Sequence, residues 1–262
     1  MPFSTTPLIS ALSTTQHVVA VSIISHQHGK MVERLTNSLL PFPEVGQIRV
    51  TCNLPEALCL PPDPRIVCVN NESPLGFAAN HNNAFKECQL PYFCPLNPDI
   101  EIPHNPFPSL LAALHLTGAA LVAPRVTNAR GVCEDSIRTF PTLRSLVNKA
   151  LGLSDGRHRI NEHAALFYPQ WVAGMFMLFK RSSFAQLKGF DPQYFLYYED
   201  VDICVRAWKS GMKVLVCPQV SVVHNAQRAS RHNIRHLYWH LSSMGRYFYK
   251  HWGRLPCIQP KS

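Results

Sequence analysis

The sequence has 262 residues, of which 46% are apolar and only 16% are charged. This length allows one large domain or at most two small ones, and the low charge with ordinary apolar content excludes a disordered chain. The formal net charge of +9 favours an anionic partner such as a phosphorylated small molecule, a nucleic acid or a membrane surface, without choosing among them.

The first half of the chain alternates short β-branched runs with helical patterns. Residues 1–16 are rich in Ser, Thr and Pro and are predicted to form a loose leader. The predicted strands are 17–24, 47–53, 65–71, 91–99 and 119–126, and the predicted helices are 28–40, 77–88 and 106–117. Strands that alternate with helices in this way predict an α/β fold with a parallel sheet.

The second half is less regular. Residues 127–165 are basic and predict a loop or a helical insert, whereas 213–224, "KVLVCPQVSVVH", predicts another strand. Without a repeat or a Gly/Ser linker, residues 17–255 are expected to form a single domain. Nine cysteines without a CxxC pair match no zinc site and are typical of a reduced, cytoplasmic setting.

The segment 228–254 is basic and aromatic and contains no Asp or Glu. Its apolar residues at helical spacing, expected to pack on the domain, are Ile234, Leu237, Tyr238 and Leu241. The remaining cations could meet an anionic inner-membrane surface, or they could form a solvated face. No Lys or Arg precedes Lys30, and the longest apolar run is interrupted by His115, so neither a secretory signal nor a membrane span is expected.

Polar residues follow several of the predicted strands, where ligands bind in parallel α/β sheets. Asp99 in "CPLNPDI" is either an ordinary turn residue or a carboxylate that holds a divalent cation. Gly76 in "NNESPLGFAANHNNAF" either permits a turn or lies beside a nucleotide. His224 ends a strand and is either structural or a metal ligand.

The stretch "FLYYEDVDIC" puts three acids after large aromatic residues. All three could simply complement the dipole of a helix that begins there, and Asp202 could pair with Arg206. That explanation does not account for the position of Glu199 and Asp200 directly after a run of aromatic residues. An aromatic surround raises the pKa of a carboxyl group toward the range of a general base.

Together with "LGFAANHN", "LNPDI" and "VSVVH", the run "WVAGMFMLFKRSSFAQLKGFDPQYFLYYEDVDICVRAWKSG" resembles family 2 glycosyltransferases of the rhamnosyltransferase-like branch. The resemblance covers roughly residues 17 to 253. It implies a GT-A fold with a Rossmann-like, mostly parallel sheet flanked by helices. It also implies inverting transfer of a sugar, with rhamnose a candidate, from a nucleotide-diphosphate donor to a saccharide or lipid-linked acceptor in bacterial surface polysaccharide synthesis, lipopolysaccharide included.

The resemblance also implies roles for particular residues. The catalytic base would be Asp200 or its neighbour Glu199, and Mg²⁺ or Mn²⁺ would bind Asp99 and His224. The nucleotide-sugar side comprises Ser25, Asn53, Gly76, Phe77, Asn80 and Asn97. The acceptor side comprises Trp171, Gly174 and Tyr198.

Two departures leave the nucleotide's identity open. Cys52-Asn53 stands where family members commonly carry an Asp that contacts the base, and the first strand ends in "SHQH". A non-catalytic nucleotide-sugar-binding protein is the nearest alternative. A nucleic-acid-binding protein is less favoured, because no known nucleic-acid motif is present, and a methyltransferase would want a Gly-rich loop after the first strand. We expect a metal-dependent enzyme, cytoplasmic or peripheral at the inner face of the membrane, without a nucleic-acid partner.

Overall fold

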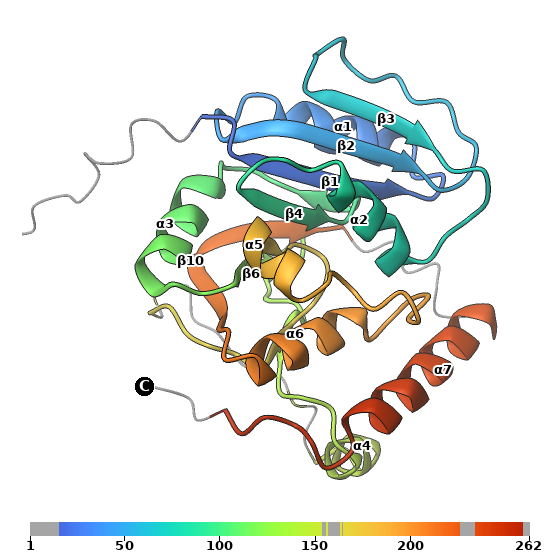
Figure 1. Ribbon diagram of the computed structural model, residues 1–262, viewed down its shortest axis with the longest axis vertical. Coiled ribbons are helices and arrows are strands. Elements are labelled where there is room, and N and C mark those ends of the chain that lie inside the picture. Colours follow the sequence, from blue (N-terminus) through green and yellow to red (C-terminus); the bar gives the residue numbers. More distant parts are fainter. Residues whose placement is uncertain (1–15, 154–155, 157–162, 164, 226–233, 259–262) are drawn as a thin grey trace, which may run out of the picture.

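A computed structural model describes residues 16–153, 156, 163, 165–225 and 234–258. The predicted leader lies outside the described residues except for Gln16, and so does the start of the basic C-terminal segment. An eight-stranded sheet runs through the molecule in the order β3-β2-β1-β4-β9-β6-β10-β5 (Figure 1). Its strands are β1 (Val19–Ser25), β2 (Val45–Cys52), β3 (Ile66–Asn70), β4 (Tyr92–Leu96), β5 (Ile100–Glu101), β6 (Leu121–Thr127), β9 (Leu178–Lys180) and β10 (Val214–His224). A separate pair joins β7 (Ile137–Arg138) to β8 (Trp171–Val172).

The sheet is mostly parallel, as the alternating sequence pattern predicted. β1 pairs in parallel with β2 and β4, and the pairs β2–β3 and β6–β10 are parallel too. The exceptions are β9, which is antiparallel to both β4 and β6, and the edge strand β5. Neither was predicted, because two or three residues are too few to show a strand's alternation.

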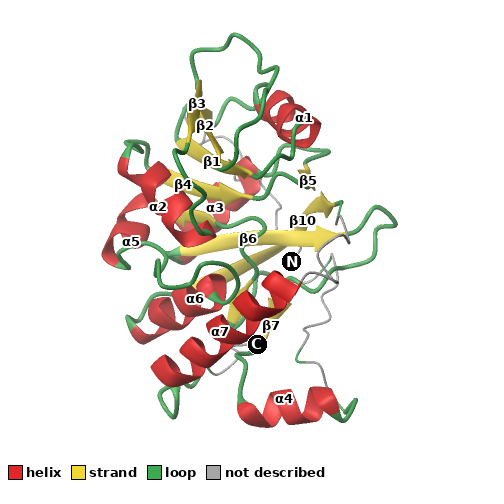
Figure 2. Ribbon diagram, turned by 90° about the vertical axis from the view of Figure 1, so that its right-hand side faces the viewer, coloured by secondary structure: helices red, strands yellow, loops and turns green. Residues whose placement is uncertain are grey.

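Helices cover both faces of the sheet (Figure 2). The helices are α1 (Lys30–Leu39), α2 (Phe77–Lys86), α3 (Phe107–Thr117), α4 (Leu143–Ala150), α5 (Arg181–Gln186), α6 (Glu199–Lys209) and α7 (Ile234–His251). α1 and α3 share one apolar core with Val21 and Ile23 of β1, whereas α2, α5 and α6 share another with Ala20. The alternation along β1 follows from the two-residue period of a strand. None of the helices in the described part of the chain is long and apolar enough to cross a bilayer.

α7 packs with a different face from the one that its apolar residues predicted. Ile234, Leu237, Tyr238 and Leu241 are 50–85% exposed, so that prediction was wrong. The buried residues are Ser243, Tyr247 and His251. The Ser243 hydroxyl donates to the Leu196 carbonyl at 2.8 Å, and the Tyr247 hydroxyl donates to the Pro141 carbonyl at 3.2 Å. Polar partners on the domain therefore decide how α7 is oriented.

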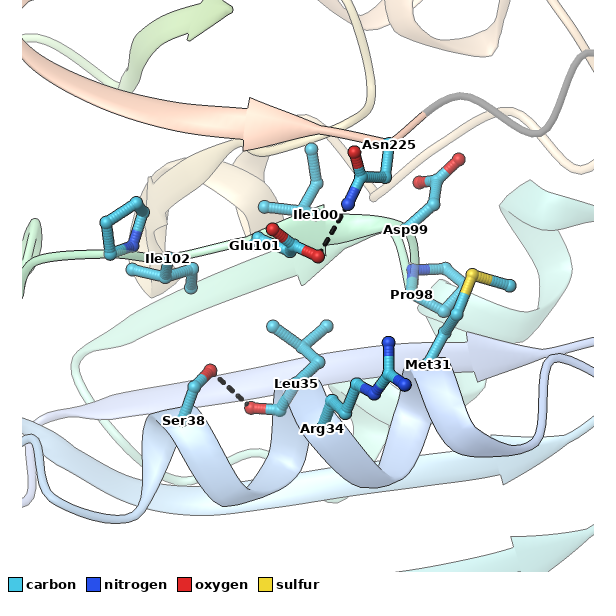
Figure 3. Close-up of a pocket in the computed structure, with 11 residues that line it drawn as sticks. Met31, Arg34, Leu35, Ser38, Pro98, Asp99, Ile100, Glu101, Ile102 and Asn225 are labelled. Carbon is cyan, nitrogen blue, oxygen red and sulfur yellow. Dashed lines mark hydrogen bonds between the residues drawn. The ribbon is translucent and has the colours of Figure 1, made fainter. Parts of the chain in front are cut away.

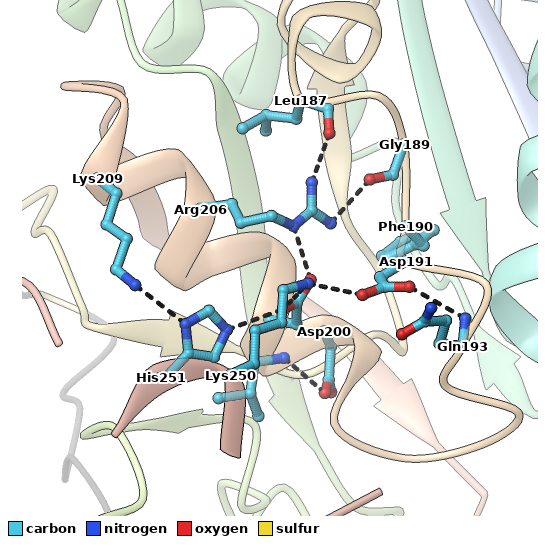
Figure 4. Close-up of polar contacts among 12 residues, drawn as sticks. Leu187, Gly189, Phe190, Asp191, Gln193, Asp200, Arg206, Lys209, Lys250 and His251 are labelled. Carbon is cyan, nitrogen blue, oxygen red and sulfur yellow. Dashed lines mark hydrogen bonds and ion pairs between the residues drawn. The ribbon is translucent and has the colours of Figure 1, made fainter. Parts of the chain in front are cut away.

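A buried carboxylate joins α7 to α6. Asp202 is fully buried and accepts from Arg206 Nε at 2.6 Å, Lys250 Nζ at 2.7 Å and His251 Nε2 at 2.8 Å. Figure 4 shows these three partners converging from the two helices. Burial alone would raise the pKa of Asp202, but the hydrogen bond from His251 and the charge of Arg206 lower it to about 2. The predicted pair with Arg206 is confirmed and is part of a larger cluster.

Candidate active site

The carboxyl ends of β1, β2 and β4 open into a cavity of about 670 Å³, the expected place for a ligand in such a sheet. The predicted site residues that line it are Asn53, Gly76, Phe77, Asn80, Asn97, Asp99, Gly174, Glu199 and Asp200. Ser25 is buried beside the cavity without lining it, and its hydroxyl accepts a hydrogen bond from the His28 backbone N–H at 3.2 Å. The structure thus gathers most of the predicted donor-side residues in one place.

Asn53 and Asn80 shape one wall of this cavity. The side-chain oxygen of Asn53 accepts from Asn71 Nδ2 and the Leu75 N–H, both at 2.8 Å, and from Asn80 Nδ2 at 3.1 Å. Its Nδ2 donates to the Leu75 carbonyl at 2.9 Å. Because these amides are already bonded within the protein, their evident role is to hold the loop that leads to Gly76.

Gly76 allows two backbone segments to touch. A β-carbon at this position would lie 2.5 Å from the Phe195 carbonyl oxygen, which is closer than real β-carbons approach. The Phe77 N–H donates to that same oxygen at 2.8 Å. The segment before α6 is therefore fastened to the start of α2, and a side chain at Gly76 would push the two apart.

The residues before α6 have an unusual backbone. Tyr197 and Tyr198 have φ angles of 71° and 67°, in the left-handed region that costs L-residues about 1–2 kcal/mol each. The Tyr197 hydroxyl meets His236 Nδ1 of α7 at 3.0 Å. Strain of this kind gathers at functional sites, where the surrounding structure enforces it. Here it brings Glu199 and Asp200 to the wall of the cavity.

Asp200 is held by backbone donors. Its Oδ2 accepts from the Gly174 N–H at 3.0 Å, and its Oδ1 accepts from the Val201 N–H at 2.8 Å. Burial raises the pKa of Asp200, and the two N–H groups oppose that rise. A β-carbon at Gly174 would lie 3.5 Å from the Asp200 β-carbon. Gly174, predicted on the acceptor side, directly positions the candidate base.

Glu199 has a different environment. It is 5% exposed, and its Oε2 has no hydrogen-bond partner among the described residues. Burial and the neighbouring charge of Asp200 raise the pKa of Glu199 well above its usual range. Two adjacent carboxyl groups in unlike surroundings take different protonation states. Of the two carboxyl groups, Glu199 therefore holds its proton more readily, and the backbone donors favour the ionised form of Asp200.

Asp99 and His224, the two residues predicted as metal ligands, lie next to each other. His224 Nε2 meets Asp99 Oδ2 at 3.0 Å, and its Nδ1 meets Glu134 Oε2 at 2.5 Å. Burial alone would lower the pKa of His224, but the bonds to the two carboxylates raise it to about 9. Glu134 was not predicted, because it lies in the irregular insert far away in sequence.

The donor set at Asp99 fits a divalent cation in part. Its Oδ1 is buried and has no hydrogen-bond partner among the described residues, which suits an oxygen ligand for a hard cation. Both ring nitrogens of His224 are bonded to carboxylates, so this side chain acts first as a partner of Asp99. The described residues include no cluster of three or more His, Cys, Asp or Glu that could hold a metal ion, so the protein alone would supply few ligands.

A second cavity of about 240 Å³ adjoins the first. Trp171 and Tyr198, predicted on the acceptor side, line this one together with Glu199 and Asp200. The Trp171 indole N–H is occupied by the Thr139 carbonyl at 2.8 Å, which fixes the ring and leaves its apolar face for a ligand. The two carboxyl groups therefore belong to both cavities.

A third hollow of about 580 Å³ lies between α1 and β5, on the other side of Asp99 (Figure 3). Its lining includes Arg34 and a hydrogen bond from Asn225 Nδ2 to Glu101, but of the predicted site residues it contains only Asp99. Glu199 and Asp200 do not reach it. It is therefore not where the predicted chemistry would take place.

Several residues of the main cavity were not predicted as site residues. His28 follows β1, and α7 contributes Arg235, His236 and Trp239. Trp239 packs on Phe195, with ring centroids 4.7 Å apart. The basic and aromatic composition of α7 was noticed in the sequence, but nothing local indicates that a segment so distant along the chain closes the site.

Comparisons with known proteins find glycosyltransferases among the sequence relatives of this chain. A family model described as the N-terminal domain of galactosyltransferase matches residues 157–238, which include the acidic stretch. Rhamnosyltransferase WbbL of Escherichia coli is 27% identical over 248 residues, which cover 88% of this chain and 92% of that protein. An N-acetylglucosaminyl-diphospho-decaprenol L-rhamnosyltransferase of Mycobacterium tuberculosis is 30% identical over 160 residues, 56% of this chain and 51% of that protein.

Solved structures agree on the fold. GalNAc-T7 with UDP, GalNAc and Mn²⁺ superposes with a TM-score of 0.65 at 16% identity, over 83% of this chain and 45% of that one. The mannosyltransferase PcManGT of Pyrobaculum calidifontis, in complex with GDP-Man and Mn²⁺, gives 0.59 at 16% identity, over 89% and 65% of the chains. The chain therefore has a GT-A fold. The sequence relatives confirm its resemblance to family 2 glycosyltransferases of the rhamnosyltransferase-like branch.

Proposed function

We propose that this protein is an inverting glycosyltransferase that uses a nucleotide-diphosphate sugar. The observation that carries the proposal is the meeting of two cavities at Glu199 and Asp200. The larger cavity, with Asp99 at its edge, suits the donor, and the smaller one, with the fixed Trp171 ring, suits an acceptor sugar. Direct displacement at a sugar's anomeric carbon needs a general base beside the acceptor hydroxyl, and a carboxylate placed between the two substrates can act as one.

In this proposal Asp200 is the general base. Its two backbone donors orient the carboxylate and favour its ionised form, while Glu199 keeps its proton. Asp200 removes the proton from the acceptor hydroxyl as that oxygen attacks the anomeric carbon. The nucleoside diphosphate leaves from the opposite face of the sugar, so the configuration at that carbon inverts.

Asp99 would hold Mg²⁺ or Mn²⁺, with His224 beside it. When bound, such a cation neutralises the charge of the departing diphosphate. His224 supports Asp99 through its hydrogen bond to Oδ2, which leaves Oδ1 for the ion. The diphosphate would complete the coordination that the protein leaves open.

The names of the sequence relatives support a finer proposal. Rhamnose is a candidate for the transferred sugar, and a saccharide or lipid-linked saccharide of bacterial surface polysaccharide is a candidate acceptor. A lipid-linked acceptor would place the enzyme at the inner face of the membrane. A non-catalytic nucleotide-sugar binder stays the alternative, because Asn97 replaces the first acid of the family's metal motif.

Release of nucleoside diphosphate tests the proposal. Purified protein is screened with UDP-, GDP- and dTDP-sugars, Mn²⁺ and saccharide acceptors. We expect turnover with one donor, and Asp200→Asn should fold normally and lose about 10²–10⁴-fold in rate. Glu199→Gln should lose less. Binding of a donor without turnover would favour the non-catalytic alternative, and a larger loss for Glu199→Gln than for Asp200→Asn would move the base to Glu199.

Removal of the metal tests Asp99. Excess EDTA should abolish turnover, and Mg²⁺ or Mn²⁺ should restore it. Asp99→Ala should slow the reaction by an amount equivalent to several kcal/mol of transition-state stabilisation, even at saturating metal. Glu101→Gln is a matched control, because Glu101 is close in sequence but does not line the main cavity. Full wild-type activity in EDTA would contradict the metal role.

A further inference from the structure

Glu199 Oε2 is a buried oxygen at the junction of the two cavities that has no hydrogen-bond partner within the described part of the chain. The residue is 5% exposed and lines both of them. Leaving such a group unpaired in a protein interior costs roughly 1–3 kcal/mol, so a partner is expected in the working state. Proton transfer from the acceptor does not supply this partner, because Asp200 is the proposed general base.

Several donors of this region have other partners. The Gly174 N–H bonds Asp200, and the Tyr197 hydroxyl meets His236. The cations Arg206 and Lys250 are bonded to Asp202, on a different part of α6. None of these contacts reaches Glu199 Oε2, which is therefore left for a ligand.

The position of Glu199 indicates which part of a ligand would meet it. The donor's diphosphate belongs near Asp99 and the acceptor near Trp171, so the transferred sugar must lie between them. Glu199 is one of three residues that line both cavities, with Tyr197 and Asp200. A sugar presents hydroxyl groups, and an uncharged carboxyl group can both donate to and accept from a hydroxyl.

We propose that Glu199 determines donor specificity by exchanging a hydrogen bond with a hydroxyl group of the transferred sugar. This assignment rests on the proposed function. A site built to hydrogen-bond a substrate hydroxyl discriminates strongly against an analogue that lacks it, because the buried polar group is then left unpaired. Glu199 acts here through binding, and the proton transfer stays with Asp200.

Two substitutions at Glu199 separate this role from general damage. Gln keeps a donor and an acceptor at the end of the side chain, whereas Ala removes both. Isothermal titration with Mn²⁺ measures the dissociation constants of UDP, GDP and dTDP, and of the sugar conjugate of whichever nucleotide binds. Glu87→Gln, an exposed carboxylate outside the cavities, is the control.

We expect Glu199→Ala to weaken binding of the nucleotide sugar by about tenfold or more, while binding of the free nucleoside diphosphate changes by less than about twofold. Glu199→Gln should bind the nucleotide sugar within a few-fold of the wild type. Equal weakening of both ligands by Ala, no weakening of either, or a Gln variant as weak as Ala would overturn the assignment. Failure of the wild type to bind any nucleotide or nucleotide sugar would overturn the proposed function, and this inference with it.

Discussion

At the scale of single residues, the adjacent acids Glu199 and Asp200 differ through their contacts. Asp200 has a backbone N–H on each oxygen, whereas one oxygen of Glu199 finds no donor among the residues that the structure describes. Their sequence context predicted raised pKa values for both, because the aromatic residues beside them are local. It could not rank the two, because the donor that distinguishes Asp200 comes from Gly174, far away along the chain.

The raised pKa of Glu199 predicts a pH-dependent cost in stability. Above pH 4.5 the unfolded chain gives up this proton, while the folded protein keeps it. The free energy of unfolding therefore falls as pH rises between 4.5 and the raised pKa. Glu199→Gln removes that cost, so it should raise the melting temperature, and by more at pH 8 than at pH 5. Thermal unfolding of both proteins at the two pH values measures the difference.

Glu72→Gln, an exposed carboxylate on the loop before α2, is the control for the loss of a surface charge. If Glu199→Gln lowered the melting temperature more at pH 8 than at pH 5, Glu199 would be ionised and stabilised in the folded protein. That result would also remove the division of labour between Glu199 and Asp200.

At the scale of helices and strands, the sequence predicted most elements to within a few residues. Local patterns were sufficient for β1, α1 and α6, where β-branched runs or apolar spacing coincide with burial. They failed for α7, because Ser243 and His251 are buried by polar partners while Leu237 remains exposed. The left-handed backbone at Tyr197 and Tyr198 has no sequence signal either, since tyrosine does not favour that conformation.

The junction of α6 and α7 depends on Asp202. The Asp202 carboxylate binds Lys250 and His251 of α7 as well as Arg206 of α6. Removing one member of a buried charge cluster leaves the others unpaired and costs about 3 kcal/mol. Asp202→Asn should lower the free energy of unfolding by about that amount, as measured by chemical denaturation.

Asp202→Asn should also disturb the main cavity, because α7 contributes Arg235 and His236 to its lining. Weaker nucleotide binding should therefore accompany the loss of stability. Asp63→Asn, which breaks a partly exposed pair with Arg65 far from α7, is the control and should have a smaller effect on stability and none on nucleotide binding. An Asp202→Asn protein as stable as the wild type would show that the cluster does not hold α7 in place.

At the scale of the whole molecule, two exposed apolar stripes border the smaller of the two cavities that meet at Glu199 and Asp200. Its lining includes Leu146 and Lys149 of α4 and His240 of α7. The exposed apolar residues are Leu143, Val147, Leu151 and Leu153 on and just after α4, and Ile234, Leu237, Tyr238 and Leu241 on α7. Figures 1 and 2 both place the two helices at the same end of the molecule. Exposed apolar patches of this kind mark protein or membrane contacts.

This arrangement changes how the proposed membrane contact should be tested. Two of the cations that could have met the membrane have partners on the domain: Arg246 bonds Gln193, and Lys250 pairs with Asp191 and Asp202. Their replacement would disturb the packing of α7 as well as its charge. The exposed apolar residues of α7 are Ile234, Leu237, Tyr238 and Leu241. They can be changed without breaking a described contact with the core.

We therefore expect the protein to bind vesicles that contain phosphatidylglycerol more strongly than pure phosphatidylcholine vesicles, because apolar insertion adds to the attraction of its net positive charge. Leu237→Glu with Leu241→Glu should weaken this binding about tenfold or more in a sedimentation assay, without lowering the melting temperature. Leu116→Glu, at a 75% exposed position on α3, is the matched control and should bind as the wild type does. Equal losses for both variants would mean that added negative charge, and not the α7 stripe, controls binding. Absence of vesicle binding by the wild type would favour an acceptor that reaches the enzyme from solution.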